Sequence, residues 1–383
     1  MESFEAKLKE ATTQEPLGLL GAIGLVVNKH GDVLYHHAAG KQRLDSAESL
    51  NLNSTVMLGS AGKFITHIAA LQLVQRGAID LDSPVWPHLP ELEALPVLQG
   101  NGDTTTATAP ITLRSLLLHT SGLSDPDSSL LKTFPEAVQK VEDAVVGAHP
   151  IVQHFSMPLA FEPGLGFAYG ASIHWTQLLV TRLAGDQSFV QHIQENIFKP
   201  LDMEQSTYAP RDRNDIWENR LQTVERCDGR FVEADDASQG LYCSILDMGK
   251  ILSDLISERP KLLELKYRNL LFEGSLSGAS LADLRNDAEN YAFCMGKHPR
   301  GEPPINWTMA GLKAEAELPL SKLPQGTVVW EGMPNVMWTM NKERGLASFF
   351  ATQLLPIGDE KANDAAVEFM KCAWSTLYEC DKQ

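Results

Sequence analysis

Residues 326–351 read GTVVWEGMPNVMWTMNKERGLASFFA, and this stretch decides the fold. It contains three runs of β-branched, aromatic and other apolar residues, at 326–330, 336–340 and 346–351, with short segments rich in Gly, Pro and Asn between them. Such runs predict consecutive antiparallel strands, and residues 341–345 predict the tight connection between the last two. The sequence therefore predicts an antiparallel sheet near the C-terminus.

The start of the chain repeats this pattern. Residues 22–27 and 33–36 predict two strands, and the segment 28–32 between them has the residues of a hairpin turn. Helices are predicted over 2–11 and over 359–377, whereas residues 80–208 read as helices and long loops, with a polar loop at 101–106.

Strands at both ends of the chain, on either side of a helical middle, predict an α+β fold. In it an antiparallel sheet is flanked by helices, and an all-helical subdomain is inserted. We expect residues 1–80 and 240–383 to form the sheet subdomain and residues 81–239 to form a mainly helical subdomain with long loops.

Composition and charge exclude several classes of protein. The 383 residues are 43% hydrophobic and 21% charged, as in ordinary globular proteins, and a chain of this length is expected to form two subdomains. A net charge of −17 repels nucleic acid and anionic membranes, so neither is expected as a partner. The acidic N-terminus is not a secretory signal, and the five scattered cysteines predict free thiols in the cytoplasm. No metal and no cofactor is expected.

The tetrapeptide Ser60-Ala61-Gly62-Lys63 begins a predicted amphipathic helix. Ser and Lys three residues apart lie on one helix face, so a partly desolvated amine can take the hydroxyl proton and activate the oxygen as a nucleophile. The alternative is an ordinary N-cap serine. A second Ser-x-x-Lys, at residues 129–132, lies in a loop-rich stretch and is interpreted as chance. Acyl transfer through a Ser60 ester is therefore the leading hypothesis.

Two further segments can complete such a site. The Pro-Gly turn at 163–164 leads to Tyr169, just before a helix predicted over 173–184, where a phenol beside Lys63 could shuttle the proton. Gly332 permits close approach of the backbone, and the Met333 N–H could pair with the Ser60 N–H as an oxyanion hole. The alternatives are a tyrosine that anchors a turn and a strand end with a buried tryptophan.

The order of these motifs resembles the serine β-lactamase-like family. Ser-x-x-Lys is followed by LLHTSGL at 117–123, by Glu-Pro-Gly at 162–164 and by Trp-x-Gly at 330–332. The family includes class C β-lactamases, penicillin-binding proteins, esterases and fungal secondary-metabolite acyltransferases that acylate statin precursors. The similarity extends from about residue 24 to residue 355, and segments 330–335 and 345–356 look most like the fungal branch.

The resemblance implies a β-lactamase/transpeptidase-like fold with the active site between the two subdomains, and it implies roles for individual residues. It makes Ser60 the nucleophile, with Lys63 and Tyr169 as the proton-transfer pair. The Met333 N–H would be the second oxyanion donor, and Gly332, Trp330 and Glu331 would contribute to oxyanion and substrate binding.

Two departures from the family pattern argue against β-lactam hydrolysis. Tyr169-Gly170-Ala171 stands where β-lactamases have Tyr-x-Asn, so the amide that engages the β-lactam side chain is missing. Trp330-Glu331-Gly332 stands where they have Lys-Thr-Gly, which removes the cation that binds the β-lactam carboxylate. Glu331 would repel that carboxylate if it faced the site.

The leading hypothesis is a cytosolic acyltransferase. A thioester of coenzyme A or of a carrier protein acylates Ser60, and a hydroxyl or amine of a small, mostly apolar acceptor then takes the acyl group. Trp330, Phe167 and Trp338 are candidates for the acceptor cleft or for the core. An esterase that uses water is the second hypothesis, and a non-catalytic binding protein is the third and weaker one. Attack by an intramolecular nucleophile, which gives cyclisation, remains open.

Overall fold

A computed structural model describes residues 1–16, 18–234, 240–295 and 303–377 of the chain. The helices are α1 Glu2–Thr13, α2 Lys63–Gln75, α3 Leu113–Leu117, α4 Ser129–Thr133, α5 Pro135–Ala144, α6 Pro150–Phe155, α7 Ser172–Leu183, α8 Phe189–Ile193, α9 Asn214–Glu218, α10 Ile245–Ile256, α11 Leu265–Leu270, α12 Gly278–Asn286, α13 Ala292–Met295 and α14 Glu360–Cys372. A 3₁₀ turn, η1, covers Gly59–Gly62.

The strands form one large and several small sheets. They are β1 Gly21–Asn28, β2 Val33–Gly40, β3 Thr55–Met57, β4 Pro96–Leu98, β5 Thr104–Thr106, β6 Ser206–Thr207, β7 Val224–Cys227, β8 Arg230–Glu233, β9 Tyr242–Ser244, β10 Ile305–Trp307, β11 Leu312–Ala314, β12 Val328–Gly332, β13 Val336–Asn341, β14 Leu346–Ala351 and β15 Leu354–Leu355. The largest sheet has the strand order β10-β11-β12-β13-β14-β1-β2, and its neighbouring strands are antiparallel. The predicted α+β class is confirmed.

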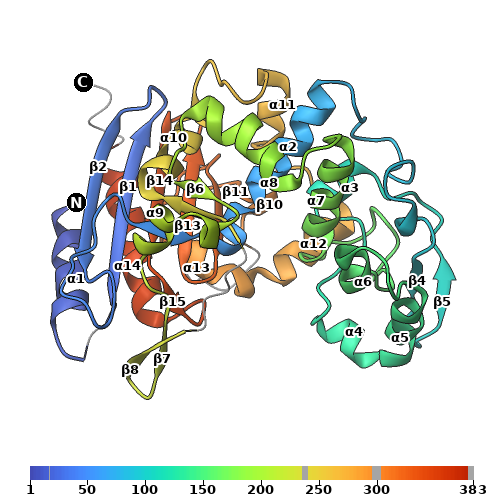
Figure 1. Ribbon diagram of the computed structural model, residues 1–383, viewed down its shortest axis with the longest axis horizontal. Coiled ribbons are helices and arrows are strands. Elements are labelled where there is room, and N and C mark those ends of the chain that lie inside the picture. Colours follow the sequence, from blue (N-terminus) through green and yellow to red (C-terminus); the bar gives the residue numbers. More distant parts are fainter. Residues whose placement is uncertain (17, 235–239, 296–302, 378–383) are drawn as a thin grey trace.

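The sheet joins the two ends of the chain. β1 pairs with β14 from Ile23 opposite Ala351 to Asn28 opposite Leu346. Figure 1 shows this sheet on the left, together with α1 and α14, and shows α3 to α7 on the right. We propose that residues 1–80 and 240–383 form the sheet subdomain and that residues 81–239 form the mainly helical subdomain.

Opposite faces of the sheet are covered by different helices. Phe4 of α1 packs against Phe350 of β14 and Phe369 of α14, with ring centroids 6.4 and 5.1 Å away. On the other face, Gly249 of α10 lies against the side chain of Leu25 of β1. Because side chains alternate along a strand, the register of β1 with β14 places neighbouring residues of these strands against different helical layers.

The polar segment 101–106 differs from its prediction. Thr104–Thr106 forms β5 and pairs with β4. The prediction of a loop over residues 101–106 is therefore wrong for residues 104–106. All three threonines are exposed, and such a strand has no alternation of apolar and polar residues to predict it. The part of the chain expected to be helical therefore contains short strands as well.

Candidate active site

Ser60 lies in a tight turn between a strand and a helix. The chain leaves β3, passes through η1 and enters α2 at Lys63, so the helix begins three residues later than predicted. The indole N–H of Trp338 donates to the Ala61 carbonyl at 2.8 Å. The Gln353 side chain accepts from the Met57 N–H and donates to the Met57 carbonyl, both at 3.1 Å. The backbone around Ser60 is thus tied to β13 and to the segment after β14.

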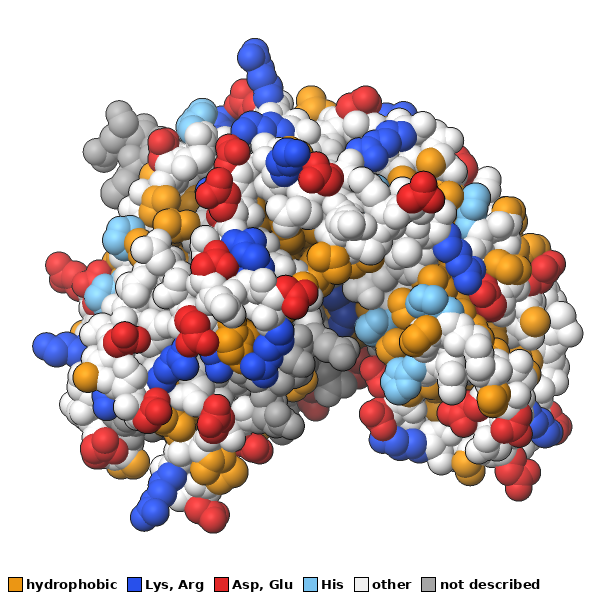
Figure 2. Space-filling view, viewed as in Figure 1, with side chains coloured by type: hydrophobic (Ala, Val, Ile, Leu, Met, Phe, Trp, Pro, Cys, Tyr) orange, Lys and Arg blue, Asp and Glu red, His pale blue; other side chains and the backbone are white. Residues whose placement is uncertain are grey.

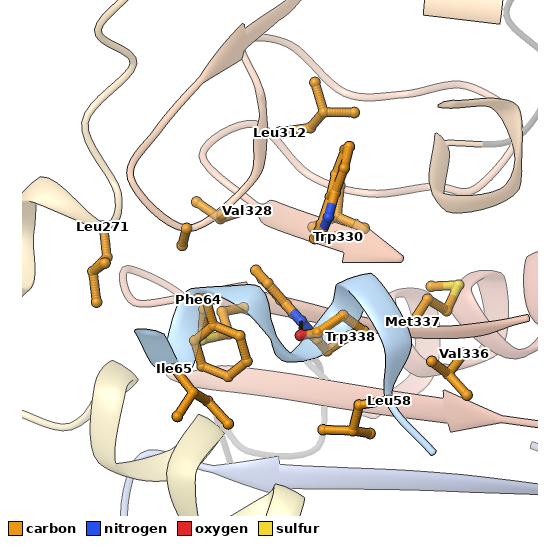
Figure 3. Packing of buried hydrophobic residues seen from close by; sticks show 14 of the residues in the cluster. Leu58, Phe64, Ile65, Leu271, Leu312, Val328, Trp330, Val336, Met337 and Trp338 are labelled. Atoms are coloured by element: carbon orange, nitrogen blue, oxygen red, sulfur yellow. Dashed lines mark hydrogen bonds between the residues drawn. The ribbon is translucent and has the colours of Figure 1, made fainter. Parts of the chain in front are cut away.

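The α2 helix is fixed to the sheet by aromatic packing. The Phe64 and Trp338 rings have centroids 5.0 Å apart, and both side chains are fully buried. Figure 3 shows these two rings together between the helix and the strands, with Trp330 projecting from β12 beside them. Trp338 therefore belongs to the core, and it positions the turn that carries Ser60.

The Lys63 amine connects the other two side chains of the candidate site. Its Nζ lies 2.7 Å from Ser60 Oγ and 2.9 Å from Tyr169 Oη, and it is 4.6 Å from the centre of the Tyr169 ring. All three side chains are half-buried. The structure therefore brings together three residues that are up to 109 positions apart in the sequence (Ser60 to Tyr169), in the arrangement that proton transfer to and from Ser60 requires.

Tyr169 is held by backbone and side-chain hydrogen bonds. The Ala168 N–H donates to the His119 carbonyl at 3.0 Å, and the Gly164 N–H donates to the Thr120 carbonyl at 2.7 Å. The Trp330 Nε1–H donates to Tyr169 Oη at 3.1 Å. The Pro-Gly turn and the LLHTSGL motif, which are separate in the sequence, thus act together to place the phenol.

Two glycines allow the turn at Ser60 to touch the end of β12. A Cβ on Gly332 would lie 2.1 Å from the Leu58 carbonyl oxygen and 3.0 Å from the Ser60 nitrogen. A Cβ on Gly59, whose φ is +51°, would lie 2.1 Å from the Met333 carbonyl oxygen. Any side chain at either position would separate the two segments, so the sequence must be glycine at both.

Two backbone N–H groups remain available where these segments meet. Within the described part of the chain, neither the Ser60 N–H nor the Met333 N–H donates to another group. The Met333 side chain is 52% exposed, so this end of β12 borders solvent. The pair matches the donors predicted for an oxyanion hole.

Glu331 lies on the other face of the sheet from Trp330. It pairs with Met337, which pairs with Phe350, and Phe350 packs against α1. Its carboxyl group is therefore directed toward the α1 and α14 layer, where it is buried. The structure does not bring Glu331 to Ser60, and the repulsion considered from the sequence does not arise.

A cluster of buried rings lies behind Tyr169, and the sequence analysis missed its importance. The His119 ring is 4.7 Å from the Tyr169 ring, 5.5 Å from Trp307 and 6.2 Å from His67. Phe167, the other candidate for the acceptor cleft, is buried in the same cluster, 5.3 Å from Trp307. One signal was present: His67 follows Lys63 by four residues and so shares its helix face.

Burial keeps both histidines uncharged. Burial is the main reason that the pKa of His67 is lowered to about 4; the hydrogen bond to the Met309 carbonyl raises this pKa, and the nearby Lys63 amine lowers it. Burial also lowers the pKa of His119 well below its ordinary value, with smaller contributions from His67 and Lys63. The cluster is thus neutral at physiological pH and adds no charge beside the Lys63 amine.

The second Ser-x-x-Lys has a different environment. Ser129 and Lys132 lie on the short helix α4, and Lys132 Nζ pairs with the exposed Asp127 carboxylate at 2.9 Å. The amine is therefore directed to a surface carboxylate, in agreement with its interpretation as chance.

A broad hollow opens on one face of the molecule. Figure 2 shows it between the part that contains the sheet and the part that contains α4 to α7, with histidine side chains on the wall nearer to α6 and α7. His174 of α7 stacks on Phe155 of α6, with ring centroids 3.8 Å apart. Burial lowers the pKa of His174 to about 4, and the nearby Lys63 charge contributes to this shift.

The sequence matches the family model described as Beta-lactamase over residues 11–369. The chain belongs to the β-lactamase family. This family member is 29% identical over 420 residues to acyltransferase calJ of Penicillium decumbens, with 100% of both chains covered. It is 28% identical over 377 residues to lovastatin esterase of Penicillium rubens, which covers 91% of this chain and 92% of the relative.

The structure of unliganded simvastatin synthase (LovD) from Aspergillus terreus has the same fold as this β-lactamase family member. The TM-score is 0.87 at 27% identity, with 99% of this chain and 98% of the other covered. The resemblance to the fungal acyltransferase branch, inferred from the motifs, is confirmed. Among the described helices, none is both long and apolar enough to cross a membrane.

Proposed function

We propose that this protein is a serine acyltransferase that moves an acyl group from a thioester donor, through an acyl-Ser60 intermediate, to a small-molecule acceptor. The observation that carries the proposal is the position of the Lys63 amine, 2.7 Å from Ser60 Oγ and 2.9 Å from Tyr169 Oη. The similarity to an acyltransferase over the full length of both chains supports it.

In the first half-reaction, the Lys63 amine acts as the base that takes the hydroxyl proton as Ser60 Oγ attacks the thioester carbonyl. The N–H groups of Ser60 and Met333 stabilise the oxyanion, and such donors contribute about 3 to 4 kcal/mol each to transition-state stabilisation. When the tetrahedral intermediate collapses, the C–S bond breaks and the sulfur leaves as a thiol with the proton. The products are the Ser60 ester and the free thiol.

In the second half-reaction, the acceptor oxygen or nitrogen attacks the Ser60 ester. Tyr169 and Lys63 remove its proton and return one to Ser60 Oγ, which regenerates the enzyme. The Trp330 N–H donates to Tyr169 Oη at 3.1 Å and so holds this oxygen in position during the transfer. The hollow between the sheet and α4 to α7 is the proposed path by which the acceptor enters.

Donor, acceptor and location can be specified further as parts of the proposal. The donor is a thioester of coenzyme A or of a carrier protein. The acceptor is a small, mostly apolar secondary metabolite with a hydroxyl or amine. The enzyme works in the cytosol, where both kinds of donor are made.

Intact-mass spectrometry with a panel of acyl-CoA and carrier-bound thioesters tests the proposal. We expect one acyl group on the wild type and none on Ser60→Ala. The matched control is Ser129→Ala, which removes the serine of the second Ser-x-x-Lys and is expected to acylate like the wild type. Acyl groups on Ser60→Ala, or none on the wild type with any donor, would contradict the proposal.

Hydrolysis is the second candidate, because the chain is also similar to an esterase over nine-tenths of its length. The two reactions share the Ser60 ester and differ only in what attacks it. Incubation of the isolated acyl-enzyme with increasing concentrations of an alcohol separates them. Transfer predicts that new ester replaces free acid as the alcohol is increased, whereas a dedicated esterase releases free acid at every concentration.

A further inference from the structure

The Tyr169 side chain is held both at its oxygen and at its ring. Lys63 and Trp330 make hydrogen bonds with its oxygen. The His119 ring packs against the Tyr169 ring with centroids 4.7 Å apart and an interplanar angle of 43°. His119 is 1% exposed, and Trp307 and Phe167 approach its ring edge-on at 5.5 and 6.2 Å. A shift of the His119 ring would therefore shift the Tyr169 ring with it.

A histidine at this position is costly for the fold. Within the described part of the chain, His119 Nδ1 is completely buried and has no hydrogen-bond partner. An unpaired buried polar atom destabilises a protein by about 1 to 3 kcal/mol. An apolar side chain of similar size would avoid this destabilisation. Some other property of His119 must therefore explain why a histidine occupies the position.

Two properties of His119 can be separated. Its φ is +56°, in the left-handed region where His, Asn and Asp are tolerated better than other side chains. Its ring is also flat and rigid, and it contacts Tyr169. The backbone requirement alone could be met by asparagine, and the ring requirement alone could be met by phenylalanine.

We propose that His119 is a positioning residue for proton transfer at Ser60, and that its ring holds the Tyr169 oxygen within reach of both Lys63 and Trp330. The inference rests on the proposed role of Tyr169. His67 limits movement of the His119 ring. The His67 Nδ1–H donates to the Met309 carbonyl at 2.7 Å, and the His67 ring lies 6.2 Å from the His119 ring. The His119 backbone contributes as well, since its carbonyl accepts from the Ala168 N–H.

The consequence for the reaction is a change of rate and not of binding. A displacement of about 1 Å at a reacting group can cost about 100-fold in rate. Loss of the ring leaves Ser60, Lys63 and the backbone N–H groups in place. The acylation rate constant should therefore fall, whereas the KM for the acyl donor should change little.

The test uses p-nitrophenyl butyrate in stopped-flow experiments on the full chain. The burst rate constant measures acylation of Ser60, and the burst amplitude counts folded, competent molecules. His119→Asn keeps the left-handed backbone and removes the ring, and its rate constant should fall about 10- to 100-fold. His119→Phe keeps a ring at a strained backbone, and its rate constant should stay closer to the wild type although its amplitude falls.

The matched control is His192→Asn in α8. His192 is likewise buried, at 2% exposed, and it interacts with Asn196. Its removal should leave the burst rate constant unchanged. This control reports the general effect of replacing a buried histidine.

Each outcome decides one question. A His119→Asn burst at the wild-type rate, with or without a smaller amplitude, overturns the positioning role and leaves the acyl-enzyme proposal intact. Equal losses of rate in His119→Asn and His119→Phe also overturn it, because the ring is then not what matters. Absence of an acyl group on Ser60 in the wild type, checked by mass spectrometry of the same samples, overturns the proposed function and this inference together.

Discussion

At the residue scale, the Lys63 amine is the centre of the site, because it is the one group among the described residues that contacts both oxygens that exchange the proton. Lys63→Met keeps the length and apolar stem of the side chain and removes the amine. We expect the acylation rate constant to fall about 10²- to 10⁴-fold, the usual contribution of a general base. Stopped-flow acylation measures the rate, and circular dichroism confirms that the fold is retained.

Lys63→Arg is the informative companion to that variant. A guanidinium stays protonated and cannot accept the Ser60 proton, so the positive charge alone should not restore the rate. Restoration by arginine would mean that Lys63 acts as a fixed charge and not as a base.

Trp330 is expected to have a smaller effect. Trp330→Phe keeps an aromatic ring in the core and removes the N–H that donates to Tyr169 Oη. A hydrogen bond makes a net contribution of about 0.5 to 1.5 kcal/mol, so the acylation rate should fall about 2- to 13-fold. Trp338→Phe removes the N–H that donates to Ala61 and should instead lower stability. If Trp330→Phe acylates at the wild-type rate, the hydrogen bond from Trp330 to Tyr169 does not contribute to the reaction.

The sequence predicts the contacts between residues that are close along the chain, but it does not predict the contacts between distant segments. Ser60 and Lys63 are joined by three residues of chain, so their spacing alone predicts that they meet. The direction of Glu331 depends on the register of β12 against β13 and β14, which no local pattern encodes. The contact of His119 with Tyr169 depends on two segments that are far apart in sequence, so it could be found only in the fold.

At the element scale, the contact between η1 and β12 is the feature most sensitive to substitution. Gly332→Ala would place a Cβ 2.1 Å from the Leu58 carbonyl oxygen and 2.6 Å from the Ala61 nitrogen. The two backbones must then separate, and overpacking of this kind costs about 1 to 3 kcal/mol. Acylation should fall about 100-fold because the oxyanion donors move apart.

The control for Gly332→Ala is Gly100→Ala. At Gly100 an added Cβ meets no atom within 4 Å, so both rate and stability should stay near those of the wild type. Burst kinetics and urea unfolding of the two variants are compared. A Gly332→Ala variant with normal acylation would contradict the placement of the oxyanion donors at this junction.

Elements with long apolar patterns were predicted well, and short ones were not. β12, β13 and β14 follow from three apolar runs joined by turn residues. The strands β3, β6 and β9 have only two or three residues each, and β10 and β11 have three, which is too few to show a period. Their pairing is set by tertiary contacts, for example Met57 opposite Tyr242.

At the scale of the whole molecule, the buried histidines make stability depend on pH. Burial lowers the pKa of His67 to about 4 and lowers the pKa of His119 strongly, whereas an unfolded histidine titrates near 6.5. As pH falls below about 6.5, the unfolded chain binds protons that the folded chain does not. The free energy of unfolding should therefore decrease by about 1.4 kcal/mol per pH unit for each histidine, down to about pH 4 for His67.

Urea unfolding between pH 7 and pH 4.5 measures this decrease. Asp254 acts in the opposite direction, because burial raises the pKa of its carboxyl group and the fold then binds its proton more readily at low pH. His119→Phe removes one titrating group and should reduce the slope against pH. A wild type that is equally stable at pH 7 and pH 5 would show that these histidines are not held neutral.

The pairing of β1 with β14 has a consequence for synthesis of the protein. β1 is synthesised long before its partner strand β14, which begins at Leu346. Until β14 is made, the edge of β1 that faces it stays unpaired, and until β12 is made Ser60 has no β12 backbone beside it. A nascent chain that lacks these strands therefore carries a serine without its oxyanion hole, and it exposes a strand edge to which chaperones can bind.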